Sequence, residues 1–384
     1  MKFQTTCATF ADAIERALRV VPSSSSEPVF MQILMSVEDG RIDMTSTDNR
    51  RMLKASFQGE GETESGSIAM DSKRLKSLLP RIKAKGDMAM VLSVDNKLNV
   101  HMAMGATVYK VNGNPSEKFP LFPSLSEGEK EERTMESLEL FRLLAFAGIP
   151  MKSSCPITFG DILIELFPSC VRIVSTDSVR LTVGQTEGTP LQEQATNQAC
   201  IPYASAKDVS KLFKDSGPIR LELEPDSLTL HGKVDSVSLS LTCRQSEKTF
   251  PKYRRILEGI EENPIQLSCA SKALVEALRD LEPIACENKH KVTLHTEELN
   301  PNTLHATAFN PELGEACASL SCMSRIDDSN LEPVGFSAKF ILEFLDVMKK
   351  SDTITMGIRS SIYPALFRAK GEPRLSYILM PINI

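Results

Sequence analysis

The 384-residue sequence contains no tryptophan, and Phe, Trp and Tyr together make up only 6 % of it. It also lacks a long apolar run, because the stretch Leu143–Pro150 is far shorter than the ~20 residues that cross a bilayer as a helix. Polar residues follow Met1-Lys2-Phe3, where a secretory signal would have an apolar segment. We therefore expect neither an integral membrane protein nor a Sec-exported one, and we predict a cytoplasmic location.

Motifs for metal binding and catalysis are also missing. The nine cysteines form no C-x-x-C pair and have no regular spacing, which argues against a disulfide framework and a zinc ribbon. No phosphate-binding G-x-x-x-x-G-K-[ST] loop and no H-E-x-x-H helix motif occurs. We expect reduced thiols, no cofactor, no metal and no catalytic activity.

One enzymatic alternative stays open because three of the five histidines, His290, His295 and His305, lie close together in the sequence. A dispersed metal-dependent site around His290 and His295 with nearby acids is conceivable on this spacing. No carboxylate accompanies these histidines at helical spacing, so surface or strand histidines are the simpler interpretation.

A repeat of about one third of the length organises the chain. The segment Ile42–Asp48 recurs as Val171–Asp177 and more faintly as Leu304–Asn310, at offsets of 129 and 133 residues, close to a third of 384. Asp48 and Asp177 occupy equivalent places in this repeat. We therefore interpret both as turn residues and not as a pair of catalytic carboxylates.

Helical and strand patterns keep the same period. Lys73, Lys207 and Lys339 each follow a short strand-like segment and a polar cap, and they lie 134 and 132 residues apart. Apolar and polar residues alternate over 98–104 and 237–243, which is typical of antiparallel strands with one buried face. We predict an α+β fold of three repeated domains, each with two helices packed on antiparallel sheets: residues 1–128 (N-terminal), 129–258 (central) and 259–384 (C-terminal).

The net charge of −6 is unevenly distributed. The six predicted helical stretches together carry +7, so the remainder carries −13. Solvated helix faces often favour lysine, but a basic surface on an acidic protein also suits contact with a phosphate backbone without sequence readout. The predicted helices are 10–21, 71–85, 137–147, 205–214, 271–282 and 337–350, and the densest basic patch is Lys73, Arg74, Lys76, Arg81, Lys83 and Lys85.

Three motifs carry a resemblance to a known family. Ser175–Leu181 resembles the turn A-T-D-G-H-R-L, Phe250–Ile256 resembles F-P-D-Y-R-R-V, and Tyr377–Ile384 resembles the terminal Y-V-V-M-P-M-R-L, while Phe119-Pro120 repeats the F-P element. All are features of the bacterial sliding clamp family, the beta subunit of DNA polymerase III. The resemblance runs from the first residues to the last.

The resemblance implies a non-enzymatic, head-to-tail homodimer whose six domains close into a ring around double-stranded DNA, contacted without sequence preference. It also implies binding of the DNA polymerase III alpha subunit, the clamp loader and other proteins with a clamp-binding motif. The residues expected to face DNA are Lys73, Arg74, Lys76, Arg81, Lys207, Lys211 and Lys339. Tyr109, Val111 and Ile284 are expected at the dimer interface, although ordinary core packing would also explain Tyr109 and Ile284.

The family's partner site is a pocket between the central and last domains, which accepts a peptide with glutamine and bulky apolar side chains. Without the resemblance, core packing would be the preferred explanation of the apolar members of this set. By motif, the pocket would be lined by Thr176, Arg180, Leu181, Pro251, Arg255, Ile256, Ile362, Pro364, Ile378, Met380, Pro381 and Ile382.

Some residues depart from the family pattern. Ser178-Val179 replace Gly-His, Asn383 replaces a basic residue, and Glu27 stands before Pro28 where well-known members have an arginine that touches DNA. These departures bear on peptide preference and on DNA contact by the 22–30 loop. They keep open a divergent clamp-like interaction scaffold without a replicative role.

Overall fold

The computed structural model describes residues 1–120, 130–152, 160–186, 195–286, 289–326 and 331–383. The chain divides into two compact units, one comprising residues 1–141 and 204–247 and the other residues 142–203 and 248–384. The predicted domain boundary at 128/129 lies outside the described residues. The boundary at 258/259 lies in a short connection between two helices, and the division into three domains stays a prediction.

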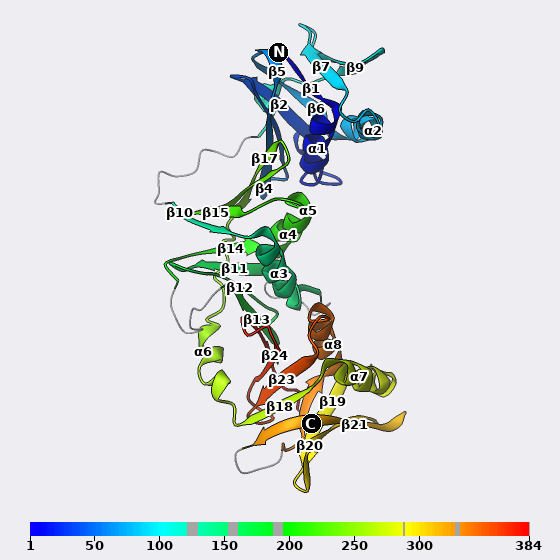
Figure 1. The fold of residues 1–384 in the computed structure, drawn as a ribbon, viewed down its shortest axis with the longest axis vertical. Coiled ribbons are helices and arrows are strands. Elements are labelled where there is room, and N and C mark those ends of the chain that lie inside the picture. Colours follow the sequence, from blue (N-terminus) through cyan, green and yellow to red (C-terminus); the bar gives the residue numbers. More distant parts are fainter. Residues whose placement is uncertain (121–129, 153–159, 187–194, 287–288, 327–330, 384) are drawn as a thin grey trace. The chain divides into compact units, whose positions relative to one another are not determined.

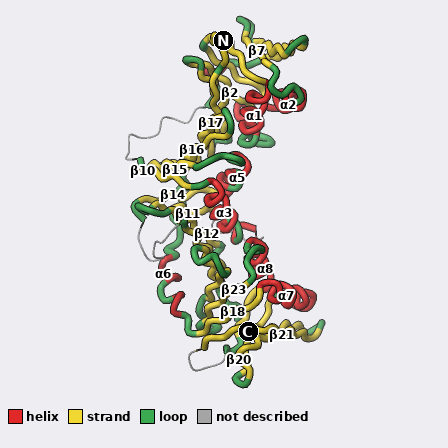
Figure 2. Tube along the Cα trace, in the orientation of Figure 1, coloured by secondary structure: helices red, strands yellow, loops and turns green. Residues whose placement is uncertain are grey.

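The first unit contains a five-stranded sheet in the order β5-β1-β7-β8-β9 and an eight-stranded sheet in the order β10-β15-β16-β17-β4-β3-β2-β6 (Figures 1 and 2). Strand neighbours in both sheets are antiparallel. Its elements are β1 (Lys2–Thr6), α1 (Cys7–Leu18), η1 (Pro28–Met31), β2 (Gln32–Glu38), β3 (Arg41–Thr47), β4 (Arg51–Gln58), β5 (Glu60–Glu64), β6 (Gly66–Asp71), α2 (Ser72–Lys83), β7 (Ala89–Val94), β8 (Asn99–Met104), β9 (Thr107–Asn112), η2 (Ser116–Lys118), β10 (Glu131–Met135), α5 (Val209–Leu212), β15 (Ile219–Glu224), β16 (Ser227–Val234) and β17 (Val237–Arg244).

The second unit contains one twelve-stranded sheet in the order β14-β11-β12-β13-β25-β24-β23-β18-β21-β20-β19-β22. Its elements are η3 (Pro150–Lys152), β11 (Asp161–Leu166), β12 (Val171–Thr176), β13 (Arg180–Gln185), β14 (Asn197–Pro202), α6 (Arg254–Leu257), η4 (Ile260–Glu262), β18 (Ile265–Ala270), α7 (Ser271–Ala285), β19 (Lys291–Glu297), β20 (Asn300–Asn310), β21 (Gly314–Ile326), β22 (Val334–Ser337), α8 (Ala338–Val347), β23 (Thr353–Ile358), β24 (Ala365–Ala369) and β25 (Leu375–Leu379). The helices α3 (Ser137–Ala147) and α4 (Tyr203–Ala206) contain two of the three points at which the chain passes from one unit to the other, and the third lies between residues 247 and 248, after β17.

Strand pairing explains why the two units divide the central third of the chain. β17 of that third pairs with β4, which belongs to the first third, while β13 pairs with β25 of the last third. One half of the central third therefore shares a sheet with the first third, and the other half shares a sheet with the last third. The α+β class with antiparallel sheets and helices is confirmed.

The helices lie close to the predicted stretches. The first begins at Cys7, before the predicted Phe10, because the Thr6 side chain accepts a hydrogen bond from the Thr9 amide and caps the helix. Asp71 caps α2 in the same way, through the Arg74 amide at 3.0 Å. In both units the paired helices α1 and α2, and α7 and α8, pack against each other (Figure 1).

The helix predicted at 205–214 is instead two short helices, α4 and α5, separated by a turn at Lys207 and Asp208. Aspartate is a poor residue for a helix interior because its side chain competes for hydrogen bonds. Here the Asp208 carboxylate also bonds the guanidinium of Arg51 at 3.3 Å. We attribute the interruption to these two effects.

Candidate functional site

The tight turn between β12 and β13 forms one wall of the candidate site. The Thr176 hydroxyl donates to the Arg180 carbonyl at 2.7 Å, and the Arg180 amide donates to Asp177 Oδ1 at 2.8 Å. Ser178 adopts a left-handed conformation with φ of 73°, at the position where the family turn has glycine. The Met380 amide donates to the Val179 carbonyl at 3.0 Å, so the turn is attached to the chain's C-terminal segment.

A buried cation fixes this turn to α8. The Arg180 guanidinium donates from Nε to Asp177 Oδ2 at 2.8 Å and from Nη1 to Glu343, and it lies 4.0 Å from the centre of the Phe340 ring. Burial opposes its charge, but Tyr377, Glu343 and Asp177 more than offset this effect, so the pKa of Arg180 is raised. Arg180 therefore remains charged and holds the turn in place.

A cavity of about 430 Å³ opens next to this turn, wholly within the second unit. Several bulky apolar side chains at or beside it remain exposed to solvent: Ile256 (41 %), Ile362 (73 %), Tyr363 (48 %) and Met380 (37 %). Exposed apolar groups around a concave site are typical of a binding surface for a ligand or a peptide. Its lining residues are Thr176, Ser178, Val179, Arg180, Leu181, Arg255, Ile256, Glu258, Gly259, Ile260, Asn263, Arg359, Tyr363, Pro364, Ile378 and Met380.

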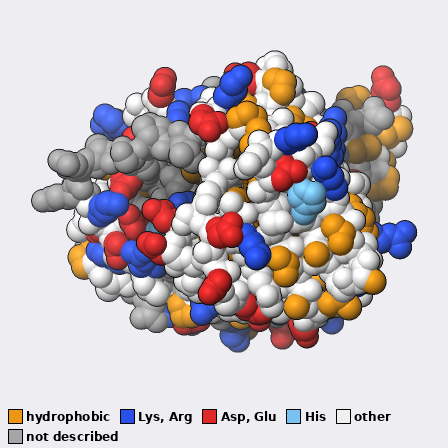
Figure 3. Space-filling model, turned by 90° about the horizontal axis from the view of Figure 1, so that it is seen from above, with side chains coloured by type: hydrophobic (Ala, Val, Ile, Leu, Met, Phe, Trp, Pro, Cys, Tyr) orange, Lys and Arg blue, Asp and Glu red, His pale blue; other side chains and the backbone are white. Residues whose placement is uncertain are grey.

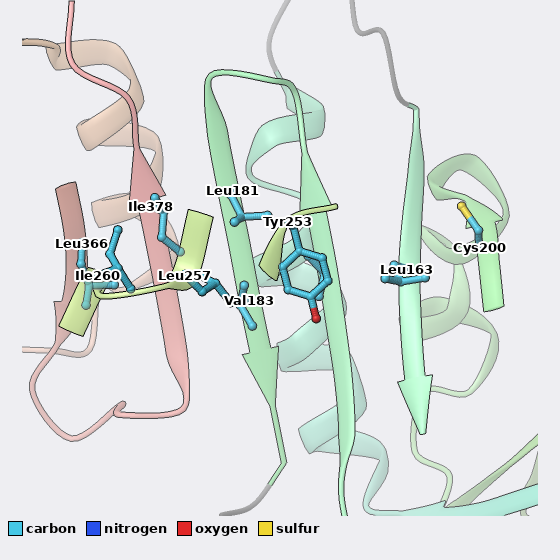
Figure 4. Packing of buried hydrophobic residues seen from close by; sticks show 10 residues of the cluster. Leu163, Leu181, Val183, Cys200, Tyr253, Leu257, Ile260, Leu366 and Ile378 are labelled. Atoms are coloured by element: carbon cyan, nitrogen blue, oxygen red, sulfur yellow. The ribbon is translucent and has the colours of Figure 1, made fainter. Parts of the chain in front are cut away.

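A hydrophobic core supports the floor of the cavity. Leu181, Ile260 and Ile378 line the cavity and also belong to a cluster of buried residues that includes Tyr253 and Leu257 (Figure 4). The Tyr253 hydroxyl donates to Glu165 Oε2 at 2.6 Å, and burial followed by the nearby Glu165 charge raises the pKa of Tyr253 to about 12. The floor is thus built from strands β13 and β25 and from the segment that contains α6.

The structure brings together eight of the twelve predicted pocket residues: Thr176, Arg180, Leu181, Arg255, Ile256, Pro364, Ile378 and Met380. The other four, Pro251, Ile362, Pro381 and Ile382, do not line this cavity. Ile362 directly precedes the lining residues Tyr363 and Pro364. The Ile382 amide instead donates to the carbonyl of Gly335 in β22 at 2.8 Å.

Sequence reasoning missed eight lining residues. In the sequence, Ser178 and Val179 stand out only as departures from a motif. Tyr363 lies between the predicted Ile362 and Pro364, and Arg359 lies a few residues before them. Glu258 to Asn263 follow the F-P-x-Y-R-R segment and carry no recognisable pattern. Gly259 turns the chain there with φ of 70°, so a glycine one position past the C-cap of a short helix is the one available signal.

The residues expected to face DNA lie on helices or in the turn between them. Lys73, Arg74, Lys76 and Arg81 are exposed on α2, which has five basic residues and no acidic one. Lys207 and Lys211 are exposed at α4 and α5, and Lys339 is half-buried on α8. On the one face that Figure 3 shows, Lys and Arg side chains are interspersed with Asp and Glu.

The predicted interface residues occupy an edge and a helix end. Tyr109 and Val111 are half-buried on β9, the last strand of the five-stranded sheet, and the neighbouring Val108 is 62 % exposed. Ile284 is half-buried at the C-terminal end of α7. Each unit therefore contains part of the predicted interface at an accessible position.

The histidines form no metal site in the described part of the chain, where no group of three or more His, Cys, Asp or Glu side chains could hold an ion. His295 and His305 stack across β19 and β20 with ring centres 5.2 Å apart. The His305 Nδ1 atom pairs with the Ser319 hydroxyl at 2.9 Å.

Among the described residues, no helix is long and apolar enough to span a membrane.

Comparisons with known proteins agree with the motifs. Residues 1–123 match the family model for the N-terminal domain of the DNA polymerase III beta subunit, and residues 261–383 match the model for its C-terminal domain. The beta sliding clamp of Chlamydia pneumoniae is 22 % identical and aligns over 100 % of this chain and 99 % of its own length. That of Vibrio cholerae is also 22 % identical, with 100 % of both chains covered.

Solved structures share the fold. The DNA polymerase III beta subunit of Pseudomonas aeruginosa superimposes with a TM-score of 0.84 over 100 % of both chains at 20 % identity. That of Thermotoga maritima gives 0.80 at 19 % identity, over 100 % of this chain and 99 % of its own. Two domain models at the two ends, full-length relatives and the clamp fold lead to one conclusion: the chain belongs to the DNA polymerase III beta subunit family, the beta sliding clamps.

Proposed function

We propose that this protein is a DNA sliding clamp, a non-catalytic homodimeric ring that encircles duplex DNA and tethers the replicative polymerase to it. The observation that carries the proposal is the pocket of the second unit, where three sequence motifs far apart in the chain meet around one apolar cavity. Its partners would be DNA polymerase III alpha subunit, the clamp loader and other proteins with a clamp-binding peptide. A replication clamp acts on the chromosome, which in bacteria lies in the cytoplasm.

The pocket suits a short peptide with bulky apolar side chains. Leu181, Ile256, Ile378 and Met380 offer apolar area, which supplies affinity by leaving water. Polar lining groups, including the exposed guanidinium of Arg255, would orient the backbone and a polar side chain such as glutamine. Val179, where the family turn has histidine, makes this wall more apolar.

The basic helices suit loose contact with DNA. Lys73, Arg74, Lys76, Arg81, Lys207, Lys211 and Lys339 would attract phosphates without reading bases. A ring held topologically needs only such weak contacts, because tight ones would stop it sliding. The overall charge of −6 is compatible with this limited attraction.

Repeat topology supports the head-to-tail dimer. β4 pairs with β17, and β13 pairs with β25, so in each case the strand after a repeat turn joins the last strand of the next third. By the same rule β21 would join β9 of a second copy. β9 lies at a sheet edge, and Gly314–Ser321 of β21 pair only with β20 among the described residues.

The function is tested by loading the protein onto nicked circular DNA with a clamp loader and a polymerase. We expect a dimer at micromolar concentration that stays on the circle through gel filtration and leaves when the DNA is cut open. Polymerase extension should become processive only when the protein is present. A monomer, or a protein that is not retained on circles, would contradict the proposal and favour a clamp-like scaffold.

A further inference from the structure

The cavity of the second unit has two chemically different sides. On the side formed by the turn between β12 and β13, the only cation is Arg180, whose side chain is fully buried and already donates to Asp177 and Glu343. The Thr176 hydroxyl on this side is also engaged, because it donates to the Arg180 carbonyl and accepts the Ser178 amide. This side can therefore pack against a peptide but offers it no free positive charge.

The other side has exposed charges. Arg255 and Glu258 come from the segment of α6 and η4, and Arg359 comes from the loop between β23 and β24. All three side chains are exposed and line the cavity. Neither arginine forms an ion pair with a residue that the structure describes. Two cations against one acid leave this side with a net positive charge.

Packing brings the two arginines to the same side of the cavity. η4 packs on β23 and β24, and the Asn263 Nδ2 atom donates to the Gly357 carbonyl at 2.9 Å, two residues before Arg359. The guanidinium of Arg359 lies over the Tyr363 ring, with its central carbon 5.2 Å from the ring centre. A cation over an aromatic face within about 6 Å is attracted by it, so the ring helps to position this guanidinium at the rim.

The loop that contains Arg359 lies outside the motifs of the family resemblance. Those motifs cover residues 175–181, 250–256 and 377–384, so they include Arg255 but neither Arg359 nor Tyr363. The charge at this part of the rim is therefore a feature of this chain's own loop. It can distinguish between peptides that fill the apolar floor equally well.

We propose that Arg359, together with Arg255, binds an acidic side chain of the partner peptide, an Asp or Glu that flanks the apolar residues held in the cavity. This inference rests on the proposed peptide-binding function. A guanidinium presents its N–H donors in a planar fork that matches a carboxylate, so it selects this group by shape as well as by charge. The loop between β23 and β24 thus selects among partner proteins by the charge that follows or precedes their apolar segment.

Three synthetic peptides test this preference. All share one glutamine and bulky apolar residues, and both termini are blocked so that no terminal charge contributes. The first has glutamate directly before the shared segment, the second has glutamate directly after it, and the third has glutamine at both places. In fluorescence anisotropy we expect one acidic peptide to bind about fivefold more tightly than the neutral one at low salt, with a smaller gain at high salt because exposed ion pairs are screened.

Substitutions assign the effect to the loop. Arg359→Gln should remove the gain and leave the affinity for the neutral peptide unchanged, since this side chain is exposed on a loop and is not part of the apolar floor. Glu258→Gln should increase the gain, because it removes the one acid on this side. The matched control is Arg325→Gln, which changes an exposed arginine that lines a neighbouring cavity and should keep the gain.

The outcomes separate this inference from the function on which it rests. Equal affinity of wild-type protein for the acidic and neutral peptides, or a gain that persists in Arg359→Gln, would overturn the inference and leave the peptide pocket intact. Failure of all three peptides to bind would contradict the proposed pocket, and this inference with it.

Discussion

At the scale of single residues, Arg180 has two roles that are usually separate. It lines the pocket, and it is also fully buried against Asp177 and Glu343. A buried ion pair of this kind contributes little net stability relative to an apolar replacement of the whole group, but losing one partner is costly. The turn that shapes the pocket therefore depends on one side chain.

We predict that Arg180→Met lowers the free energy of unfolding by about 3–5 kcal/mol, because Asp177 remains buried without its cation. Urea denaturation followed by circular dichroism measures the change. Lys349→Met is the matched control, since its ion pair with Asp346 is exposed and is worth about 0–1 kcal/mol. Equal losses in the two variants would show that the Arg180 network adds nothing beyond a surface pair.

At the scale of elements, basic charge is concentrated in one helix. α2 has five Lys and Arg residues and no acid, whereas α7 has Lys272 and Arg279 against three acids, and α8 has Lys339 against two. The total charge of +7 over all predicted helices does not show that most of it comes from α2. We expect α2 to supply most of the electrostatic attraction to DNA.

The triple variant Lys73→Gln, Lys76→Gln and Arg81→Gln should shorten retention on nicked circles and reduce the dependence of DNA affinity on salt. A plot of log K for DNA binding against log salt concentration has a negative slope, and each lost phosphate contact makes that slope less steep by about 0.9. Titration of DNA at several salt concentrations gives this slope. The control variant has the exposed Lys97, Lys118 and Lys233 changed to Gln, so it loses the same number of positive charges as the α2 variant. An equal reduction of the salt dependence in this control would refute a special role for α2.

At the scale of the whole molecule, the ring and the pocket are separable. All lining residues of the pocket belong to the second unit of a single chain. The proposed dimer contacts lie on β9 and on α7, and no residue of either element lines that cavity. Peptide binding should therefore survive the loss of the dimer, whereas topological retention on DNA should not.

The double variant Tyr109→Asp with Ile284→Asp tests this separation. We expect a monomer that binds a clamp-binding peptide with unchanged affinity and is no longer retained on circular DNA.

The variant Met380→Glu should have the opposite effect. We expect it to remain a dimer but to bind the peptide about tenfold more weakly, because the substitution puts a charge in an apolar cavity. Fluorescence anisotropy and sedimentation measure both properties, and joint loss in either variant would argue against independent sites.

The sequence by itself predicted the repeat and the positions of all helices except the one expected at 205–214, which is interrupted. These follow from local physics: hydrophobic periodicity specifies helices and strands, and the turn around Asp177 and Arg180 is stabilised by residues three apart. Motifs then indicated Thr176, Leu181 and Met380, because each lies within or beside a short recognisable segment.

Only the tertiary structure decided which distant residues meet. Glu258, Gly259, Ile260 and Asn263 line the cavity because β13 pairs with β25 and brings α6 alongside, a contact that no local pattern encodes. The same applies to Glu343, which lies 163 residues from Arg180. Long-range pairing of this kind depends on the shapes and edges of complete sheets, so it emerges only when the chain is folded.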